Sequence, residues 1–512
     1  MLHTRLIASV PELFDRHARE QPEKVAYSDS SRSVTYGSLA GRTASIAAGL
    51  AALGLREGDN LALFLPNGVD WIEACFAGLR AGAVIVPISY EAVEGEVSYR
   101  LADADCRMIV TTTARRDLVA KIASGLEQPI SVICAGGGAT TTETAFESLA
   151  ATAGGKPLDP TDIERASFII YTSGTTGRAK GVLLTVRGML WIAASCWAPI
   201  GGLTHEDTIL SPLPLFHSYA LNLSVLSVLA AGASEHIMEK FSPQHALELL
   251  QTGRYTIFPG VPTMFHYIMQ RATELGLTSL GDVRLCISAG AIMPATLNRA
   301  FEEKFKIPLL DGYGITETST MVTMNWLTGD RPMGSCGLPV PGLAVRIVDP
   351  ATVQDVPIGA EGELIVRGPN LMLGYHNKPT ETAAALRNGW YHTGDLAKSD
   401  LNGFLTITGR IKELIIRGGQ NIAPAEIEEV AIQHPQVLDC AVVGVAHATL
   451  GEAPHLFVVA AEGELDIESL LAHCRKNLSS YKVPEMTHIV AEIPRTGSGK
   501  IMRFKLVEEL RS

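Results

Sequence analysis

Short apolar strands alternate with amphipathic helices along the first part of the chain. Residues 61–65, Leu-Ala-Leu-Phe-Leu, predict a strand that ends at Pro66, and residues 71–81 predict the helix after it. A helix between two strands returns the chain to the same end of a sheet, so that the strands pair in parallel. The pattern therefore predicts an α/β fold, with further strands at residues 83–87, 108–112, 130–134 and 283–288.

The pattern changes after Asn325. Short strands between turn residues predict a small, mostly β subdomain, at residues 343–349, 362–367 and 403–408. From Lys412 onward two helices and two strands predict an α+β domain, at residues 424–433, 467–478, 439–444 and 455–460. Because 512 residues are too many for one ordinary core, we expect at least two domains and place their boundary at residues 408–412.

Composition excludes several classes of protein. Apolar residues make up 46% of the chain and charged residues 19%, which excludes a disordered chain. The net charge of −12 argues against a nucleic-acid binder, because such proteins need a basic surface. The eight cysteines form no Cys-x-x-Cys pair and no cluster with histidine, which favours free thiols in a reducing compartment. With no signal-peptide pattern and no uninterrupted apolar span, we expect no transmembrane segment and a cytoplasmic protein.

A segment rich in glycine and hydroxyl side chains follows a predicted strand, Tyr171-Thr-Ser-Gly-Thr-Thr-Gly-Arg-Ala-Lys-Gly181. Its glycines allow the backbone to approach a ligand closely. Its hydroxyls and consecutive N–H groups are suited to phosphate oxygens, and Lys180 supplies positive charge. It lacks the Gly-Lys-Ser/Thr of a Walker A loop. We interpret it as a phosphate loop made of Thr172, Ser173, Gly174, Thr175, Thr176, Gly177 and Lys180.

A tyrosine stands between two glycines in Leu310-Asp-Gly-Tyr-Gly-Ile-Thr-Glu317. The glycines leave the ring of Tyr313 accessible for stacking on a flat base. Glu317 is a hard oxygen ligand suited to Mg²⁺ beside phosphates. A tyrosine flanked by glycines also occurs in ordinary turns, so this motif alone identifies no site.

Two further motifs lie towards the C-terminus. In Gly389-Trp-Tyr-His-Thr-Gly-Asp395, the carboxylate of Asp395 is suited to the two hydroxyls of a ribose, and the nearby Arg410 to a hydroxyl or a phosphate. Pro494-Arg-Thr-Gly-Ser-Gly-Lys500 predicts a glycine hairpin that presents Lys500. It is not a P-loop, because Ile501 stands where Ser or Thr is needed.

Together the four motifs resemble those of the ANL adenylating superfamily, which comprises acyl- and aryl-CoA synthetases, adenylation domains of non-ribosomal peptide synthetases, and luciferases. The resemblance covers essentially the whole chain, with the motifs in the family's order. It implies an N-terminal domain, residues 1–409, of two doubly wound sheets and a small β-barrel-like subdomain, and a smaller, mobile α+β C-terminal domain, residues 410–512. It also implies that ATP and Mg²⁺ convert a carboxylic acid to an acyl-adenylate, from which coenzyme A displaces AMP.

The resemblance also implies roles for individual residues. Lys500 matches the lysine that contacts the carboxylate and the α-phosphate, Glu317 the Mg²⁺ ligand, and His217 the residue that gates the acyl pocket; with Thr172 they form the expected catalytic set. The remaining nucleotide-binding positions are Ser173, Gly174, Thr175, Thr176, Gly177, Lys180, Gly290, Ala291, Asp311, Gly312, Tyr313, Gly314, Thr316, Asp395, Ile407 and Arg410. The acyl-pocket positions are His217, Ser218, Gly260, Ser288, Gly312 and Gly314.

The resemblance places a hinge at Lys412 and the pantetheine of coenzyme A beside Gly418 and Gly419. Adenylation domains for amino acids carry an Asp shortly after the position of His217, whereas Phe216-His-Ser-Tyr-Ala220 contains no acid. A carboxylic acid without an amino group is therefore favoured. No carrier-protein segment follows Lys500, which favours free coenzyme A as the acceptor.

Several alternatives stay open. The same motifs fit a stand-alone ligase that loads the phosphopantetheine of a carrier protein, and less well a luciferase-type oxygenase. A non-catalytic nucleotide binder is disfavoured by the intact Lys500, Glu317 and Asp395. The acid stays open among medium-chain fatty, alicyclic and aryl acids; a short dicarboxylate is less favoured because the matched pocket segments contain no arginine. A homodimer is compatible with the sequence.

Overall fold

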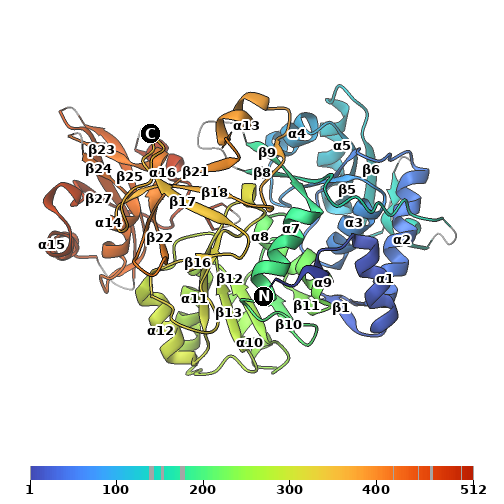
Figure 1. Cartoon of the computed structure of the whole chain (residues 1–512), viewed down its shortest axis with the longest axis horizontal. Helices are drawn as coiled ribbons and strands as arrows, with labels where there is room; N and C mark the ends of the chain where they lie inside the picture. Colours follow the sequence, from blue (N-terminus) through green and yellow to red (C-terminus); the bar gives the residue numbers. More distant parts are fainter. Residues whose placement is uncertain are drawn as a thin grey trace.

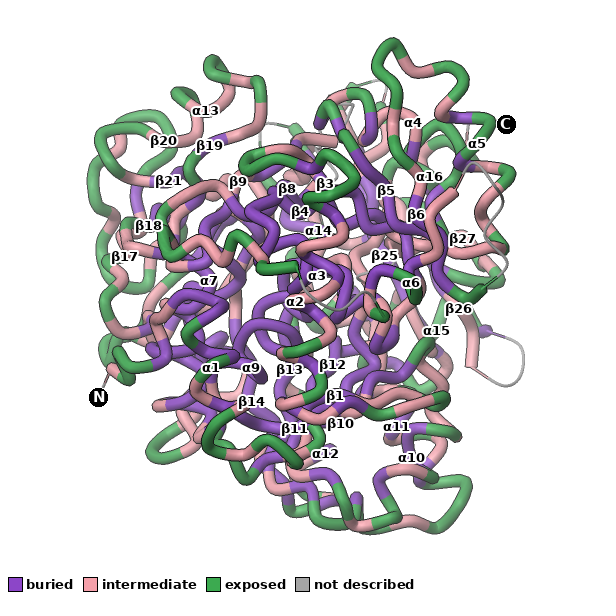
Figure 2. Tube along the Cα trace, turned by 90° about the vertical axis from the view of Figure 1, so that its right-hand side faces the viewer, coloured by how far each residue is buried: buried purple, intermediate pink, exposed green. Residues whose placement is uncertain are grey.

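The computed structural model describes residues 2–137, 143–151, 155–172, 179–418, 420–447, 449–461, 465–496 and 499–510. One end of the molecule holds the N-terminal helices and the other end holds the C-terminal domain, with the remaining sheets between them (Figure 1). Buried backbone is concentrated in the interior, and exposed segments lie at the periphery (Figure 2).

An eight-stranded sheet has the strand order β19-β9-β8-β4-β3-β5-β6-β7. Its strands are β3 (Asn60–Leu63), β4 (Val84–Pro87), β5 (Cys106–Thr112), β6 (Ser131–Ala135), β7 (Thr144–Ala145), β8 (Ala166–Thr172), β9 (Lys180–Thr185) and β19 (Gly374–Tyr375). The helices of this region are α1 (Val10–Glu20), α2 (Tyr36–Ala52), α3 (Val69–Arg80), α4 (Glu94–Asp103), α5 (Arg116–Ser124) and α6 (Phe146–Ala151). Strands β3 to β6 pair in parallel, which confirms the predicted α/β alternation.

A nine-stranded sheet has the order β16-β15-β14-β13-β12-β10-β11-β1-β2. Its strands are β1 (Val25–Ser28), β2 (Ser33–Thr35), β10 (Thr208–Ser211), β11 (Ser234–Ile237), β12 (Ile257–Gly260), β13 (Leu285–Ser288), β14 (Leu309–Tyr313), β15 (Thr323–Met324) and β16 (Leu338–Pro339). Helices α10 (Pro243–Leu250), α11 (Pro262–Glu274) and α12 (Ala295–Phe305) contribute apolar side chains to the core on one face of this sheet.

Two interrupted helices fill the centre of the large domain. Helix α7 (Val186–Ile192) continues into a π-helical turn, and α8 (Ser218–Ala220) continues through a second π-helical segment into α9 (Val228–Ala231). Nearly all of their side chains are buried in the largest core cluster, which explains the apolar composition of this region. In the part of the chain that the structure describes, no helix is long and apolar enough to cross a membrane.

The two large sheets are mixed, and here the expectation of parallel sheets is only partly right. β8 pairs antiparallel with β9, and β14 pairs antiparallel with β15. Strands joined by helices are parallel, but a short connection leaves the next strand antiparallel to its neighbour. The predicted phosphate loop therefore joins the two strands of a hairpin.

The predicted β subdomain is a five-stranded antiparallel sheet, made of β17 (Ala344–Val348), β18 (Gly362–Arg367), β20 (Leu386–Arg387), β21 (Trp390–Ser399) and β22 (Leu405–Arg410), with helix α13 (Pro379–Ala385) beside it. The C-terminal domain contains β23 (Ile415–Arg417), β24 (Gln420–Ile422), β25 (Val437–His447), β26 (Gly451–Ala460), β27 (Met486–Ile489), α14 (Pro424–Ala431), α15 (Ile467–Asn477) and α16 (Arg503–Glu509). Its strands form a separate sheet with its own core, as the α+β prediction requires.

Candidate active site

The phosphate loop is framed by the hairpin β8–β9, in which Thr172 pairs with Lys180. The Thr172 hydroxyl lies 3.5 Å from the carbonyl oxygen of Lys180. The Lys180 ammonium lies 5.1 Å from the centre of the Tyr375 ring, within the range of a cation–π interaction. Residues 173–178, which include the predicted phosphate ligands Ser173, Gly174, Thr175, Thr176 and Gly177, lie outside the described residues.

A tightly bonded cluster joins Tyr313, Asp395 and Arg410. Asp395 lies opposite Arg410 on β21 and β22, and Arg410 Nε is 2.7 Å from Asp395 Oδ1. The Tyr313 hydroxyl at the end of β14 donates to the other oxygen, Asp395 Oδ2. The Asp395 side chain is only 3% exposed, so both of its oxygens have partners in a site with little water. Three residues from distant parts of the sequence are thus held together as a unit.

Glu317 and Thr316 lie in a short 3-10 turn, Thr316–Thr318, directly after Tyr313. The turn packs so closely on the following loop that a side chain at Gly314 would lie 1.4 Å from the Thr320 carbonyl oxygen. The Thr316 hydroxyl lies 3.1 Å from the hydroxyl of Ser218 on α8. Tyr375 donates from its hydroxyl to Glu317 Oε1 at 3.0 Å. The glycines flanking Tyr313 therefore serve close packing of the turn as well as access to the ring.

Lys500 and His217 lie close enough for the charge of Lys500 to act on His217. Thr496 N–H donates to the Lys500 carbonyl, which closes the predicted hairpin, and a side chain at Gly499 would lie 3.2 Å from Val261 in the large domain. Burial lowers the pKa of His217 to about 3, and the charge of Lys500 acts in the same direction. His217 is therefore neutral at physiological pH.

Burial also lowers the pKa of Lys500, with the charge of Arg410 acting in the same direction. The carboxylates of Asp395 and Glu317 oppose this effect. Lys500 is half-buried, and both carboxylates lie within electrostatic reach of it. An anionic substrate in this space would stabilise its charge.

Three predicted residues lie side by side at the carboxyl ends of adjacent parallel strands. Gly260 of β12 pairs with Ser288 of β13, and Ser288 pairs with Asp311 of β14. Ser288 Oγ and Asp311 Oδ1 are buried without a hydrogen-bond partner among the described residues. Burial raises the pKa of Asp311 well above its usual range, so its carboxyl group favours the neutral form. Unpaired buried polar atoms are rare and mark a place where a ligand or water belongs.

The remaining predicted positions surround this centre. Gly290 follows β13 with a positive φ of 89°, the left-handed region that glycine adopts readily, and Ala291 after it is exposed. Side chains at Gly312 and Gly290 would meet Met321 at 2.4 Å and Val261 at 3.7 Å. Ile407 is half-buried on β22, opposite Ala397.

Of the two predicted coenzyme A residues, the structure describes one. Gly418, with a φ of 57°, is exposed in the β23–β24 turn, and Gly419 lies outside the described residues. Figure 1 places β23 and β24 at the outer end of the C-terminal domain. Lys412 is exposed in a 3-10 turn, Ile411–Glu413, between β22 and β23. In this arrangement Lys500 lies within electrostatic reach of Arg410, Asp395 and Glu317.

The described residues contain no group of three or more His, Cys, Asp and Glu side chains that could hold a metal ion. Glu317 nevertheless suits Mg²⁺, because this ion in nucleotide sites is held by one or two carboxylates together with phosphate oxygens. Tyr375 was missed by sequence reasoning. Its only local signal is a Gly-Tyr pair some 58 residues after Glu317, and nothing in the pattern shows that the two meet.

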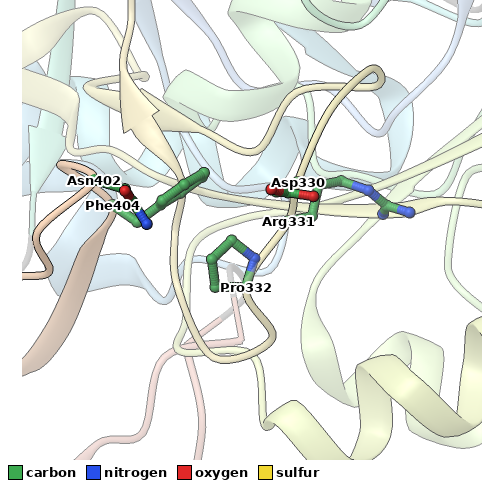
Figure 3. A pocket seen from close by; sticks show the side chains of 5 residues that line it. All are labelled: Asp330, Arg331, Pro332, Asn402 and Phe404. Carbon is green, nitrogen blue, oxygen red and sulfur yellow. The ribbon is translucent and has the colours of Figure 1, made fainter.

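An open pocket of about 580 Å³ lies elsewhere, lined by Asp330, Arg331, Pro332, Asn402 and Phe404 (Figure 3). Arg331 is already paired with Glu302, at 2.5 Å between Nη1 and Oε1. None of the predicted site residues lines this pocket.

Comparison with known families matches residues 14–376 to the AMP-binding enzyme family and residues 426–500 to the AMP-binding enzyme C-terminal domain. The chain is 34% identical to a feruloyl-CoA synthase of Amycolatopsis over 493 residues, which cover 95% of this chain and 96% of that protein. It is 33% identical to a long-chain-fatty-acid–CoA ligase of Escherichia coli O6:H1, over 98% of this chain and 95% of that protein.

Solved structures give the same result. The anthranilate CoA ligase AuaEII in complex with anthranoyl-AMP superposes with a TM-score of 0.92 at 25% identity, covering 99% of this chain and 98% of that one. ATP-bound MatB from Rhodopseudomonas palustris superposes with a TM-score of 0.89 at 31% identity, covering 98% of this chain and 99% of that one.

Proposed function

The chain belongs to the AMP-binding enzyme family and is an AMP-forming acid–CoA ligase, and we propose that its reactions take place around the Tyr313–Asp395–Arg410 cluster. ATP and coenzyme A are its co-substrates, and Mg²⁺ is its metal cofactor. In the first step a carboxylate oxygen of the acid attacks the α-phosphorus of ATP and pyrophosphate leaves. In the second step the thiol of coenzyme A attacks the acyl carbon and AMP leaves. The observation that carries this proposal is that Lys500, on the C-terminal hairpin, lies within electrostatic reach of Asp395 and Arg410 of that cluster.

The proposed nucleotide site follows from the chemistry of each side chain. Tyr313 offers a ring face to adenine, and Asp395, held by Arg410, offers carboxylate oxygens to the ribose hydroxyls. We propose that Asp311, whose Oδ1 has no hydrogen-bond partner among the described residues, lies beside the adenine base. The hairpin of Thr172 and Lys180 surrounds the β- and γ-phosphates. Thr316 binds the α-phosphate, and Glu317 holds Mg²⁺, which supplies charge that neutralises the phosphates.

Lys500 is proposed as the catalytic cation of adenylation. Negative charge develops on the oxygens of the α-phosphoryl group while both the attacking and the leaving oxygen are partly bonded. A preoriented ammonium with little water around it stabilises that charge more than it does in water. His217 stays neutral and limits the acyl side of the site without adding a second cation.

Thioester formation needs a different face of the C-terminal domain. Gly418 is exposed in the β23–β24 turn, whereas Lys500 lies within electrostatic reach of Asp395 and Glu317. We therefore propose that the residues after Lys412 rotate as a body between the two steps, while the residues before it, Arg410 among them, stay fixed with the large domain. A few hinge residues can absorb such a change in backbone angles.

We propose an apolar monocarboxylic acid, with aryl acids first, as the substrate. The segments that follow β12 and β13 are apolar or small and carry no arginine for a second carboxylate. Relatives act on ferulate and long-chain fatty acids by name, and structural neighbours include anthranilate and benzoate CoA ligases. Medium-chain fatty and alicyclic acids are the next classes to test.

The test is release of pyrophosphate from ATP and Mg²⁺ across a panel of acids, with and without coenzyme A. Turnover that needs coenzyme A and one class of acid supports the proposal and identifies the substrate. If pyrophosphate release does not depend on coenzyme A and a thioester forms on a carrier protein, the acceptor is the carrier protein and not coenzyme A. Absence of AMP formation with every acid class would contradict the proposal.

Two further expectations are proposals about the cell and the assembly. A cytoplasmic location is supported by free thiols, since all eight cysteines are unpaired and buried. Fractionation of the source cells tests it. The homodimer rests on the frequency of two-fold oligomers among enzymes, and sedimentation at micromolar concentration tests it.

A further inference from the structure

The segment around Tyr375 ties the phosphate-loop hairpin to the turn that carries Glu317. Strand β19 pairs with β9, Tyr375 lying opposite Val182. The His376 N–H donates to the Gly181 carbonyl at 2.7 Å, and the Met372 N–H donates to the Glu317 carbonyl at 2.8 Å. Five successive residues thus bond to both halves of the proposed phosphate site, although they follow Glu317 by more than fifty positions.

The side chain of Tyr375 contacts a charged residue from each half. Its hydroxyl donates to Glu317 Oε1 at 3.0 Å, and its ring faces the Lys180 ammonium at 5.1 Å. The hydroxyl of Tyr391 lies 3.5 Å from that of Tyr375. The hydroxyl therefore contacts a carboxylate, and the ring faces a cation.

The chemistry of Tyr375 suits this place. Its hydroxyl carries one proton, and this proton is donated to the Glu317 carboxylate. A hydrogen bond to one carboxylate oxygen restricts rotation of the group and leaves the other oxygen for a ligand. Groups that orient a metal ligand in this way typically change metal affinity about 10- to 100-fold when removed.

We propose that Tyr375 is a positioning residue of the first half-reaction: its hydroxyl orients Glu317 for the divalent cation and its ring orients Lys180 for the terminal phosphates of ATP. The inference rests on the proposed roles of Glu317 and Lys180. It assigns Tyr375 no contact with substrate. It predicts that the hydroxyl and the ring have separable effects, one on the metal and one on the nucleotide.

The experiment uses the full chain and does not depend on turnover. Mn²⁺ is titrated into protein with α,β-methylene ATP, and free Mn²⁺ is read from its paramagnetic resonance signal. The variants are Tyr375→Phe, which keeps the ring and removes the hydroxyl, and Tyr375→Leu, which removes both. Tyr90→Phe is the matched control, because it removes a partly buried hydroxyl that bonds Thr112 at 2.7 Å, away from the proposed site residues. Glu317→Gln tests the role on which the inference rests.

Tyr375→Phe is expected to weaken Mn²⁺ binding about tenfold and to leave metal-free nucleotide binding within about twofold. Tyr375→Leu is expected to weaken metal-free nucleotide binding as well. In turnover, the Mg²⁺ concentration for half-maximal pyrophosphate release should rise in Tyr375→Phe, while kcat at saturating Mg²⁺ stays near wild type. A loss of kcat with unchanged metal dependence would mean that Tyr375 only supports the fold and would overturn the inference.

The metal role of Glu317 and the positioning role of Tyr375 are contradicted by different outcomes. If Glu317→Gln weakens Mn²⁺ binding and Tyr375→Phe does not, the positioning role is wrong and the role of Glu317 stands. If neither variant changes Mn²⁺ binding, the metal role of Glu317 is wrong, and the inference falls with it. If Tyr90→Phe weakens Mn²⁺ binding as much as Tyr375→Phe, the effect is general loss of packing and the inference is also overturned.

Discussion

The two halves of the proposed site are held in different ways. On the side of the large domain, Tyr313 and Asp395 lie on strands of two sheets and are bonded to each other. On the side of the C-terminal domain, Lys500 lies on a short hairpin that reaches the large domain through packing of Gly499 near Val261. One half therefore lies on strands of the large domain, whereas the other belongs to a domain with its own core. We propose that this difference lets one site serve two reactions in turn.

The junction between the halves is narrow. Arg410 is paired with Asp395 of the large domain, and Glu413, three residues later, is paired with Arg503 of α16 at 3.1 Å. Arg503 also bonds Glu428 on α14. We propose that the backbone between these two ion pairs, Ile411 and Lys412, absorbs the rotation.

The largest effect is expected from removing Lys500, on the side of the C-terminal domain. Lys500→Ala should lower the rate of pyrophosphate release about 10²- to 10³-fold, the usual effect of removing one group that stabilises transition-state charge. Thioester formation from supplied acyl-adenylate should stay near wild type, because Lys500 leaves the site for that step. The two half-reactions are measured separately, and Lys505→Ala, an exposed lysine of α16, is the control. Equal loss in both steps would contradict the distinction between the halves.

The second largest effect is expected from a change at Asp395, on the side of the large domain. Asp395→Asn removes the negative charge that faces Arg410, and should raise the KM for ATP by roughly 10- to 100-fold, a loss of about 1.4–2.7 kcal/mol, because Arg410 loses its charged partner in a largely buried pair. Asp355→Asn is a matched control. Asp355 pairs with Arg346 at the same 2.7 Å but is 68% exposed, so little change is expected. Similar KM values for both variants would mean that burial is not what gives Asp395 its importance.

A proline tests the junction itself. Lys412 lies in a 3-10 turn, whose φ is close to the value that proline fixes, so Lys412→Pro should preserve the arrangement with Lys500 in place. Adenylation should stay within about threefold of wild type, and thioester formation should fall by about tenfold or more, because the hinge can no longer rotate freely. Lys412→Ala, which restores rotation, should recover the second step. A thioester rate unaffected by proline would place the hinge elsewhere.

The smallest effect concerns pH. The pKa of His217 is lowered to about 3 in the folded protein, whereas an unfolded histidine has a pKa near 6.5. Between these pH values the unfolded chain binds a proton at His217 and the folded chain does not. The contribution of neutral His217 to the free energy of unfolding is therefore complete above about pH 6.5 and is lost as the pH falls towards 3. Between pH 6.5 and 5, wild type should lose up to about 1.4 kcal/mol per pH unit relative to His217→Gln. Urea unfolding at several pH values measures it, with His245→Gln at an exposed histidine as the control; equal slopes would contradict the buried, neutral state.

Local pattern was enough for most of the elements. The helix predicted at residues 71–81 is α3, and the strand predicted at residues 362–367 has the same bounds as β18. Period and turn residues depend only on neighbours in sequence, so the order of strands and helices, the two-part architecture and the motif residues could be read from the chain. The prediction of parallel strands was partly wrong at the edges of the sheets, because the pairing direction there depends on the length of the connection between two strands.

The tertiary structure alone decided which residues act together. Asp395 and Tyr313 are 82 positions apart, and Tyr375 and Glu317 are 58 apart. Contacts at such separations depend on sheet order and on packing between domains, and no local period encodes them. The same holds for the lowered pKa of His217, because burial and the charge of Lys500 come from distant segments. The sequence by itself determined the chemical groups of this enzyme, and the fold determined their partners.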